Sequence, residues 1–402
     1  MAFDGLRFIH ACNLYLDHAL AGIASVSEKL RPICEDATLT AFDQILAECI
    51  ERQVHFLLLT GNLFDPTDLS LRARLQLIEG LSLLEQHDIR VFIVPGTVDP
   101  PEAWDDGIPL PDNVTAFLAN DCDPVAVLKD RRVIASVRVI GSGGNELDRI
   151  EQQSTRSIPS QSGVEAVSGQ SRSAPYSVAV LDPRTSAEFI AASRPANHEP
   201  AGDYLALSGD SLRLTRLTSH GLAHHPGPSQ GLTTAQTGLC SCTLVDVDSD
   251  GSAELTILPT ASVRRERCQL TVSAETTQDE LLDRILDEVK RQKTEENERA
   301  WYVEWMIDGS GPLMSWLEDE SAVSEFADLV AIEMTERFPL PRQDVFLLQI
   351  REETAPLKQM APNLLQRFPS AASELPARED LIDAGQELIA AGLLDHSTLE
   401  TL

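Results

Sequence analysis

The chain has 402 residues, of which 43% are hydrophobic and 24% charged, a composition typical of a globular protein with more than one domain. Its formal net charge is −31 at pH 7, so we expect direct DNA binding to be weak, because nucleic-acid recognition depends on Lys and Arg. No stretch approaches 18 continuous apolar residues, and the N-terminal residues predict a strand instead of a signal peptide, which favours a cytoplasmic protein without a membrane span.

The first hundred residues alternate strands and helices. Buried strands are predicted at 6–14, 54–61 and 89–99 from their apolar composition. Between them, 37–53 and 70–88 carry apolar residues at the spacing of amphipathic helices. This strand-helix-strand-helix-strand order predicts a parallel sheet covered by helices, with functional residues in the loops that follow the strands.

The composition changes near residue 145. Residues 148–176, approximately, are rich in Ser, Gln and Gly and predict a flexible insertion. Strand-like segments follow at 176–183 and 202–210, and 238–259 has the pattern of a hairpin that turns at Asp248–Gly251.

The pattern changes again after Pro259, where strands and helices alternate in a way that predicts a small α+β domain. A strand leads into a helix that Thr277 is expected to cap, with Glu280 three residues later completing a capping box. Further elements are predicted as a strand at 298–309, a helix at 324–338, a strand at 343–353 and a final helix at 377–394.

The loops that follow the predicted strands occur in a familiar order. They are HACNLYLD (10–17), GNLFDP (61–66), GTVDPP (96–101), VAVLDP (178–183) and DYLALSGDSLRL (203–214). Their order and spacing resemble the calcineurin-like metallophosphoesterase domain of the SbcD/YhaO-like DNA repair exonucleases. LPTASVRRERCQLTV (258–272) is similar to that family's passage from the nuclease domain into its capping domain.

The resemblance implies an α/β fold in three parts. Residues 1–262 are expected to form a metallophosphoesterase β-sandwich flanked by helices. Residues 263–355 are expected to form a small α+β capping domain, and residues 356–402 a helical C-terminal tail.

The resemblance also identifies the positions where the family holds two Mn- or Mg-type cations. The family's motifs are D-x-H, G-D-x-x-D, G-N-H-D/E, a lone His and G-H-x-H, because two divalent cations need carboxylates and imidazoles as ligands and a His as general acid. In this chain every one of these motifs is altered. The altered positions are Asn13, Tyr15, Asn62, Thr97, Val98, Asp182 and, with a one-residue ambiguity between Gly209/Ser211 and Asp210/Leu212, Asp210.

Residues that shape the loops are retained, whereas residues that hold metal or move protons are not. The retained loop-shaping residues of the first three motifs are Gly61, Asp65, Gly96 and Asp99. An amide at the bridging position offers a neutral oxygen where the cations prefer a charged one. The altered positions are therefore expected to be either inert replacements or a remodelled polar pocket.

The resemblance thus implies a catalytically inactive relative, without a bound cofactor. Its expected role is structural or regulatory, with an SbcC-like coiled-coil ATPase as the partner, and the family also implies a homodimer. The alternative is an active metal-dependent phosphoesterase or nuclease with substitute ligands, for which Asp182 could join Asp65, Asp99 and Asp210 in a carboxylate site.

Three smaller groups of residues complete the sequence-based expectations. His220, His224 and His225 lack the spacing of a known zinc site and are expected to be solvated loop residues. Segment 262–267, SVRRER, is expected at the junction between domains, paired with acids, although it could also contact phosphate. The seven cysteines are expected to be reduced and buried.

Overall fold

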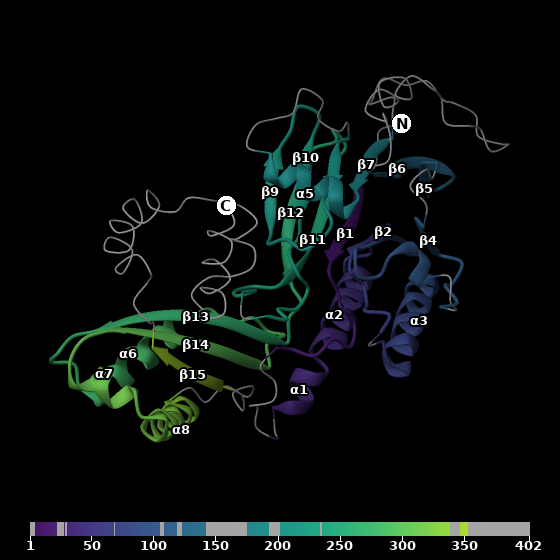
Figure 1. The fold of residues 1–402 in the computed structure, drawn as a ribbon. Helices are drawn as coiled ribbons and strands as arrows, with labels where there is room; N and C mark the ends of the chain where they lie inside the picture. Colours follow the sequence, from purple (N-terminus) through teal and green to yellow (C-terminus); the bar gives the residue numbers. More distant parts are fainter. Residues whose placement is uncertain are drawn as a thin grey trace, which may run out of the picture.

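The computed structural model describes residues 5–21, 28, 30–67, 69–104, 108–118, 123–141, 175–192, 202–233 and 235–337, together with the strand at 346–352. The described residues form two six-stranded sheets and one three-stranded sheet, with helices alongside (Figure 1). The predicted α/β class is confirmed. The predicted insertion falls mostly on residues that are not described, and the predicted tail falls entirely outside the described residues.

The first sheet contains the predicted strand-helix-strand-helix-strand unit. Its strand order is β12-β11-β1-β2-β3-β4, with β1 to β4 parallel and β11 antiparallel to both β1 and β12. Its strands are β1 (Leu6–Cys12), β2 (Phe56–Gly61), β3 (Arg90–Pro95), β4 (Val114–Ala116), β11 (Ser241–Val247) and β12 (Ala253–Pro259). The last two strands are the predicted hairpin.

Three helices accompany this sheet. They are α1 (Arg31–Glu35), α2 (Ala37–Glu51) and α3 (Leu71–Gln86), and the last two match the predicted amphipathic helices. Ser70 caps α3 by accepting a hydrogen bond from the Ala73 backbone N–H at 3.1 Å. Leu77, Leu81 and other apolar residues of α3 and α2 pack on the face of the sheet formed by Ile9, Leu57 and their neighbours.

The second sheet packs face to face against the first. Its order is β5-β6-β7-β8-β10-β9. The strands are β5 (Val125–Lys129), β6 (Arg132–Ile140), β7 (Tyr176–Leu181), β8 (Tyr204–Ala206), β9 (Leu214–Leu217) and β10 (Leu222–His225), with α5 (Pro183–Ala191) after β7. Because side chains alternate along a strand, β1 sends Ile9 to the helices and Phe8 into the core between the sheets. Phe8 stacks there on Phe56, with ring centroids 4.5 Å apart, and meets Tyr204 edge-on.

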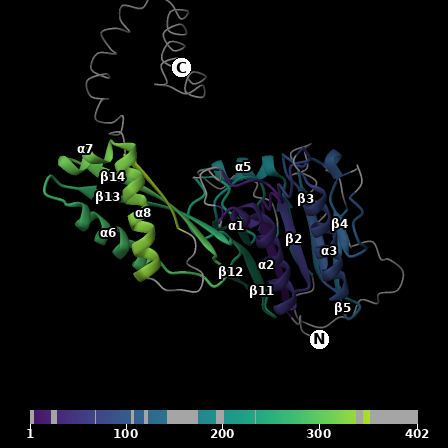
Figure 2. The same cartoon turned by 90° about the horizontal axis from the view of Figure 1, so that it is seen from below.

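The third sheet forms a separate α+β unit that follows β12. Its parallel strands are β13 (Val263–Val272), β14 (Ala300–Gly309) and β15 (Phe346–Glu352). Its helices are α6 (Gln278–Arg291), α7 (Pro312–Leu317) and α8 (Glu320–Arg337), which Figure 2 shows beside the sheet and apart from α2 and α3. The capping box of Thr277 and Glu280 is confirmed, since each side chain accepts a hydrogen bond from the other residue's backbone N–H. We refer to 263–352 as the cap unit.

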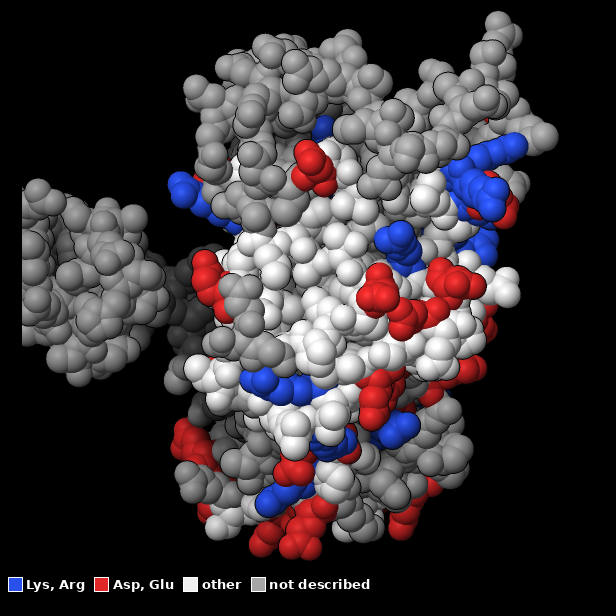
Figure 3. Space-filling model, turned by 90° about the vertical axis from the view of Figure 1, so that its right-hand side faces the viewer, with Lys and Arg blue, Asp and Glu red and all other residues white. Residues whose placement is uncertain are grey.

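One face of the molecule carries its charged side chains unevenly. On the side where α3, β4 and β5 lie, a broad area without charged residues is bordered by acidic and basic side chains (Figure 3). None of the helices in the described ranges is long and apolar enough to cross a membrane. The six cysteines in the described part of the chain are free and buried, as predicted, and Cys122 lies outside it.

Candidate functional site

Three of the loops that the sequence singles out follow neighbouring strands of the first sheet. Strands β1, β2 and β3 are parallel and in register, with Cys12 opposite Thr60 and Gly61 opposite Pro95. Their carboxyl ends therefore lie side by side. The backbone of the first loop is unusual, because Asn13 and Tyr15 have φ values of 54° and 43°, in the left-handed region that non-glycine residues seldom adopt.

Asn13 connects the first loop to the second loop and to Gly209, which follows β8. Its side-chain N–H donates to the carbonyl of Gly209 at 2.7 Å, and its Oδ1 accepts from the backbone N–H of Asn62 at 3.1 Å. The side chain is 2% exposed. Both the nitrogen and the oxygen of the Asn13 amide are thus hydrogen-bonded within the protein. The bond to Gly209 joins residues that are 196 positions apart in the sequence.

Asn62 lies at the centre of the cluster and is fully buried. Its Nδ2 donates to the hydroxyl of Tyr15 at 2.6 Å, and its Oδ1 accepts from the backbone N–H of Val98 at 2.9 Å. The Thr97 hydroxyl lies 3.5 Å from the same Oδ1. Gly96 lies so close that a Cβ there would collide with Oδ1. The Asn62 side chain is therefore enclosed by residues of the three loops.

Tyr15 connects this cluster to the second sheet. Its hydroxyl donates to the carboxylate of Asp210, whose two oxygens lie at 3.0 and 3.1 Å. Burial, together with the neighbouring Asp210 charge, raises the pKa of Tyr15. The structure therefore joins six of the seven altered positions in one hydrogen-bonded network, which we call the cleft network: Asn13, Tyr15, Asn62, Thr97, Val98 and Asp210.

The seventh position, Asp182, is directed elsewhere. It is the N-cap of α5, and its Oδ1 accepts from the backbone N–H of Thr185 at 2.7 Å. Asp65 similarly turns back on its own loop, since its Oδ1 accepts from both the N–H and the hydroxyl of Thr67. These hydrogen bonds hold both carboxylates against residues two or three positions further along the chain.

Asp99 connects the second and third loops through hydrogen bonds to their backbone. Its two carboxylate oxygens accept from the backbone N–H of Gly96 at 2.8 Å and of Leu63 at 3.2 Å. Burial raises the pKa of Asp99 to about 7, and these two hydrogen bonds oppose the rise because they favour the ionised form.

A second polar network, which the sequence did not reveal, lies beneath the loops. His10 has Nδ1 3.0 Å from the Tyr204 hydroxyl and Nε2 2.9 Å from the Thr60 hydroxyl. Thr60 donates onward to the Cys12 sulfur at 3.3 Å, so its oxygen accepts from His10 Nε2–H and the Tyr204 hydroxyl donates to Nδ1. All four side chains are fully buried, and burial raises the pKa of Cys12 to about 12, which keeps it a thiol.

The prediction that His224 and His225 are solvated loop residues is wrong, because both lie on β10 and are fully buried. His225 Nδ1 accepts from the Gly227 N–H at 3.0 Å, so Nε2 carries the proton and donates to the Gly209 carbonyl at 2.9 Å. His224 bonds the hydroxyls of Thr215 and Thr243. His220 is exposed, as expected.

Replacing Thr60 with valine is expected to destabilise the protein by about 1–3 kcal/mol. Valine keeps the shape of the side chain but leaves His10 Nε2–H without its acceptor in a buried site. Urea unfolding followed by circular dichroism measures the change. Thr256→Val is a suitable control, since Thr256 lies on β12 and is exposed. Equal stability of the two variants would contradict the hydrogen-bond assignment.

The donor set of the cleft does not fit two divalent cations. Among the residues that the structure describes, no three His, Cys, Asp or Glu side chains gather closely enough to hold a metal ion. The cleft network offers one carboxylate, Asp210, and neutral amide and hydroxyl groups that already bond one another. A pair of cations needs several charged oxygens or free imidazoles.

Known proteins that show similarity to this chain include one sequence relative and two solved structures. A segment of 132 residues is 30% identical to the uncharacterized metallophosphoesterase YhaO of Bacillus subtilis (strain 168), covering 33% of this chain and 32% of that protein. The match thus spans about a third of the relative's length. TT1561 of Thermus thermophilus superposes with a TM-score of 0.34 at 10% identity, covering 63% of this chain and 99% of that one.

GAP50 of Plasmodium, described as the anchor in the inner membrane complex, has a TM-score of 0.34 at 12% identity, covering 64% of this chain and 89% of that one. TM-scores of 0.34 are too low to establish a shared fold. No family model matches the chain. The identity with YhaO supports a relationship to the metallophosphoesterases.

Proposed function

We propose that this protein is a catalytically inactive relative of the SbcD-type exonucleases that serves as a structural or regulatory subunit. One observation carries the proposal, namely the closure of Asn62 within its own loops. Its Nδ2 and Oδ1 are both bonded, at 2.6 Å to the Tyr15 hydroxyl and at 2.9 Å to the Val98 N–H. The group at the position of the bridging ligand therefore contributes to stability and has no oxygen directed at a cation.

The side chains around Asn62 support the same function. Val98 has no proton to give at the position of the family's general acid, and the loss of such a group typically lowers the rate by about 10²–10⁴-fold. Thr97 donates toward Asn62 and contributes a neutral hydroxyl. With Asp182 capping α5, Asp210 is the carboxylate that remains in the cleft network.

The experiment combines metal analysis with an activity assay. After dialysis against Mn²⁺ and removal of free metal, we expect less than stoichiometric Mn by elemental analysis. We also expect no hydrolysis of bis(p-nitrophenyl) phosphate or of duplex DNA above buffer. Stoichiometric metal with hydrolysis that disappears in Asp210→Asn, but persists in the control Asp112→Asn at an exposed position, would establish the alternative of an active phosphoesterase with substitute ligands.

We further propose that the partner is an SbcC-like coiled-coil ATPase. The resemblance of segment 258–272 to the passage into the family's capping domain supports this partner, and the acidic chain supports DNA contact through a partner instead of through its own surface. Co-expression with a coiled-coil ATPase of the source organism is expected to give one complex in size-exclusion chromatography. Separate elution of the two proteins at micromolar concentration would contradict the assignment.

A further inference from the structure

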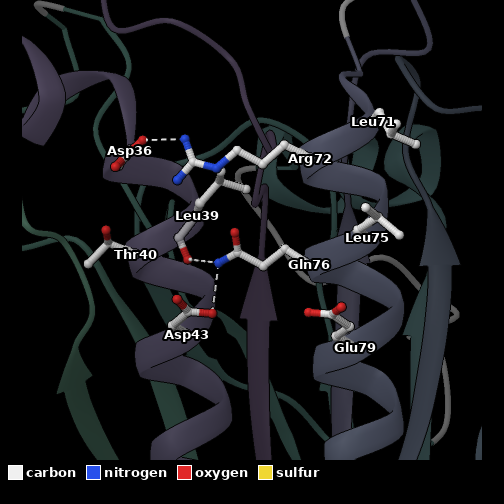
Figure 4. A pocket seen from close by; sticks show the side chains of 9 residues that line it. All are labelled: Asp36, Leu39, Thr40, Asp43, Leu71, Arg72, Leu75, Gln76 and Glu79. Atoms are coloured by element: carbon white, nitrogen blue, oxygen red, sulfur yellow. Dashed lines mark hydrogen bonds and ion pairs between the residues drawn. The ribbon is translucent and has the colours of Figure 1, made fainter.

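A surface groove lies between α2 and α3 and belongs to neither polar network. Its volume is about 760 Å³. Figure 4 shows that its walls come from the amino-terminal halves of both helices. The lining residues are Asp36, Leu39, Thr40, Asp43, Leu71, Arg72, Leu75, Gln76 and Glu79.

Side chains of α3 reach across the groove and fix its two walls together. Arg72 forms an ion pair with Asp36 at 2.6 Å. Gln76 donates to the carboxylate of Asp43 at 2.8 Å and to the carbonyl of Leu39 at 3.3 Å (Figure 4). The groove is therefore preformed, and the single positive charge among its lining residues is already paired with Asp36.

The groove offers an incoming chain both apolar and acidic surface. Leu71 and Leu75 are 74% and 49% exposed, and their spacing of four residues places them on one side of α3. Asp43 on α2 and Glu79 on α3 are exposed and lie at the same end of the groove, where no Lys or Arg lines it (Figure 4).

We propose that this groove binds a basic amphipathic helix of another protein. Apolar residues on one face of that helix cover Leu71 and Leu75, and Lys or Arg side chains beside them meet Asp43 and Glu79. A groove between two helices matches the shape of a third helix, and recognition through anchors one helical turn apart is a common mode of peptide binding. This inference is independent of the function proposed above.

Charge distinguishes a basic helix from two other possible occupants of the groove, namely a segment of this chain and a second copy of it. The chain's own segment 378–402 has one Arg and six acidic residues, so its approach would place carboxylates against Asp43 and Glu79. A second copy would bring the same acidic grooves together, between chains that each carry a net charge of −31. A basic partner is the occupant that the charges of the groove favour.

Synthetic peptides test the proposal with the full-length protein. The probe is a fluorescein-labelled peptide of about five helical turns with Leu on one face and Lys on both flanks. Two control peptides have the same composition in scrambled order and Glu in place of every Lys. Fluorescence anisotropy is expected to show binding of the Leu/Lys helix at least tenfold tighter than of either control.

Two double variants locate the binding site. Leu71→Ser with Leu75→Ser, and Asp43→Lys with Glu79→Lys, are each expected to weaken the Leu/Lys peptide at least tenfold. Leu217→Ser, at a residue that is 83% exposed on β9, is the matched control and is expected to change nothing. All four positions are exposed, so thermal unfolding of each variant verifies the fold.

The proposal is overturned if the scrambled peptide binds as tightly as the helix, or if neither double variant affects binding. It is also overturned by the alternative occupants. A peptide of residues 378–394 that binds more tightly than the Leu/Lys helix would identify the chain's own segment. Sedimentation equilibrium that shows a dimer, which Leu71→Ser with Leu75→Ser dissociates, would identify a second copy.

Discussion

Replacing Gly61 with alanine is expected to destabilise the protein by about 2–5 kcal/mol. Two costs combine at this position. Gly61 has φ +78°, and a side chain in the left-handed region costs about 1–2 kcal/mol. The added Cβ would also collide with Asn13 Oδ1, and forcing extra atoms into a packed site typically costs about 1–3 kcal/mol. Asn13 cannot move aside without losing its bonds to Asn62 and Gly209.

Gly238 provides the matched control. It has φ +85°, close to that of Gly61, but a Cβ there meets nothing within 4 Å. Gly238→Ala is therefore expected to cost only the backbone term, about 1–2 kcal/mol. Guanidinium unfolding of both variants measures the difference. If the two alanine variants lose the same stability, the cleft network is looser than its hydrogen bonds indicate.

Lowering the pH from 7 to 5 is expected to destabilise the protein by several kcal/mol through three buried histidines. Burial lowers the pKa of His10, His224 and His225 from the ordinary value of 6.5, in the case of His224 to about 4. The unfolded chain then binds more protons than the folded one below pH 6.5. Each histidine thus contributes stability that is complete above pH 6.5 and decreases by up to about 1.4 kcal/mol per pH unit below it.

Asp99 partly offsets this decrease. Its raised pKa, about 7, means that the folded state holds a proton that the unfolded state releases above pH 4, so acidification favours folding at this residue. The net loss of stability at pH 5 is therefore smaller than the loss that the three histidines alone would give. Urea unfolding at several pH values between 7 and 5 measures how the free energy of unfolding changes with pH.

Two variants test whether the buried histidines cause the pH dependence of stability. His224→Gln removes one titrating group, and we expect a shallower pH dependence together with lower stability at pH 7. His220→Ala, at an exposed position, is expected to leave the slope unchanged. A pH profile that stays flat from 7 to 5 would show that the buried rings are accessible to protons without unfolding.

Elements with local signals could be predicted from the sequence. The helix spacing of 37–53 and 70–88, the capping box at Thr277 and the hairpin turn at Asp248–Gly251 all depend on residues close together in the chain, and all are confirmed. The parallel order of β1, β2 and β3 followed from the alternation of strands and helices.

The contacts that occupy the cleft could not be predicted in the same way. Asn13 and Asn62 were identifiable as altered positions, but their partners Gly209 and Asp210 lie 196 and 148 residues away. The hydrogen-bond partners of the Asn13 and Asn62 side-chain amides depend on how the two sheets pack against each other. Asp182 shows the converse, since its position after β7 also suits the N-cap of α5, and the local hydrogen bond to Thr185 prevails.

The buried histidines escaped prediction because a loop was expected at these residues, and histidines in loops are usually exposed to solvent, whereas the residues form β10. Strand β10 lies between β8 and β9, so both its edges are paired with neighbouring strands. His224 and His225 are accommodated because each finds buried partners, the hydroxyls of Thr215 and Thr243 for the first and the Gly209 carbonyl for the second.

The joint between the cap unit and the sandwich has a mechanical consequence. Gln230 exchanges hydrogen bonds with Val263, the first residue of β13, at 2.6 and 3.3 Å. The neighbouring Ser229 accepts from the Thr260 hydroxyl and donates to the carbonyl of Asn13. Hydrogen bonds therefore connect the start of β13, through Gln230 and Ser229, to the loop that contains Asn13. A displacement of β13 is expected to reach that loop along these bonds.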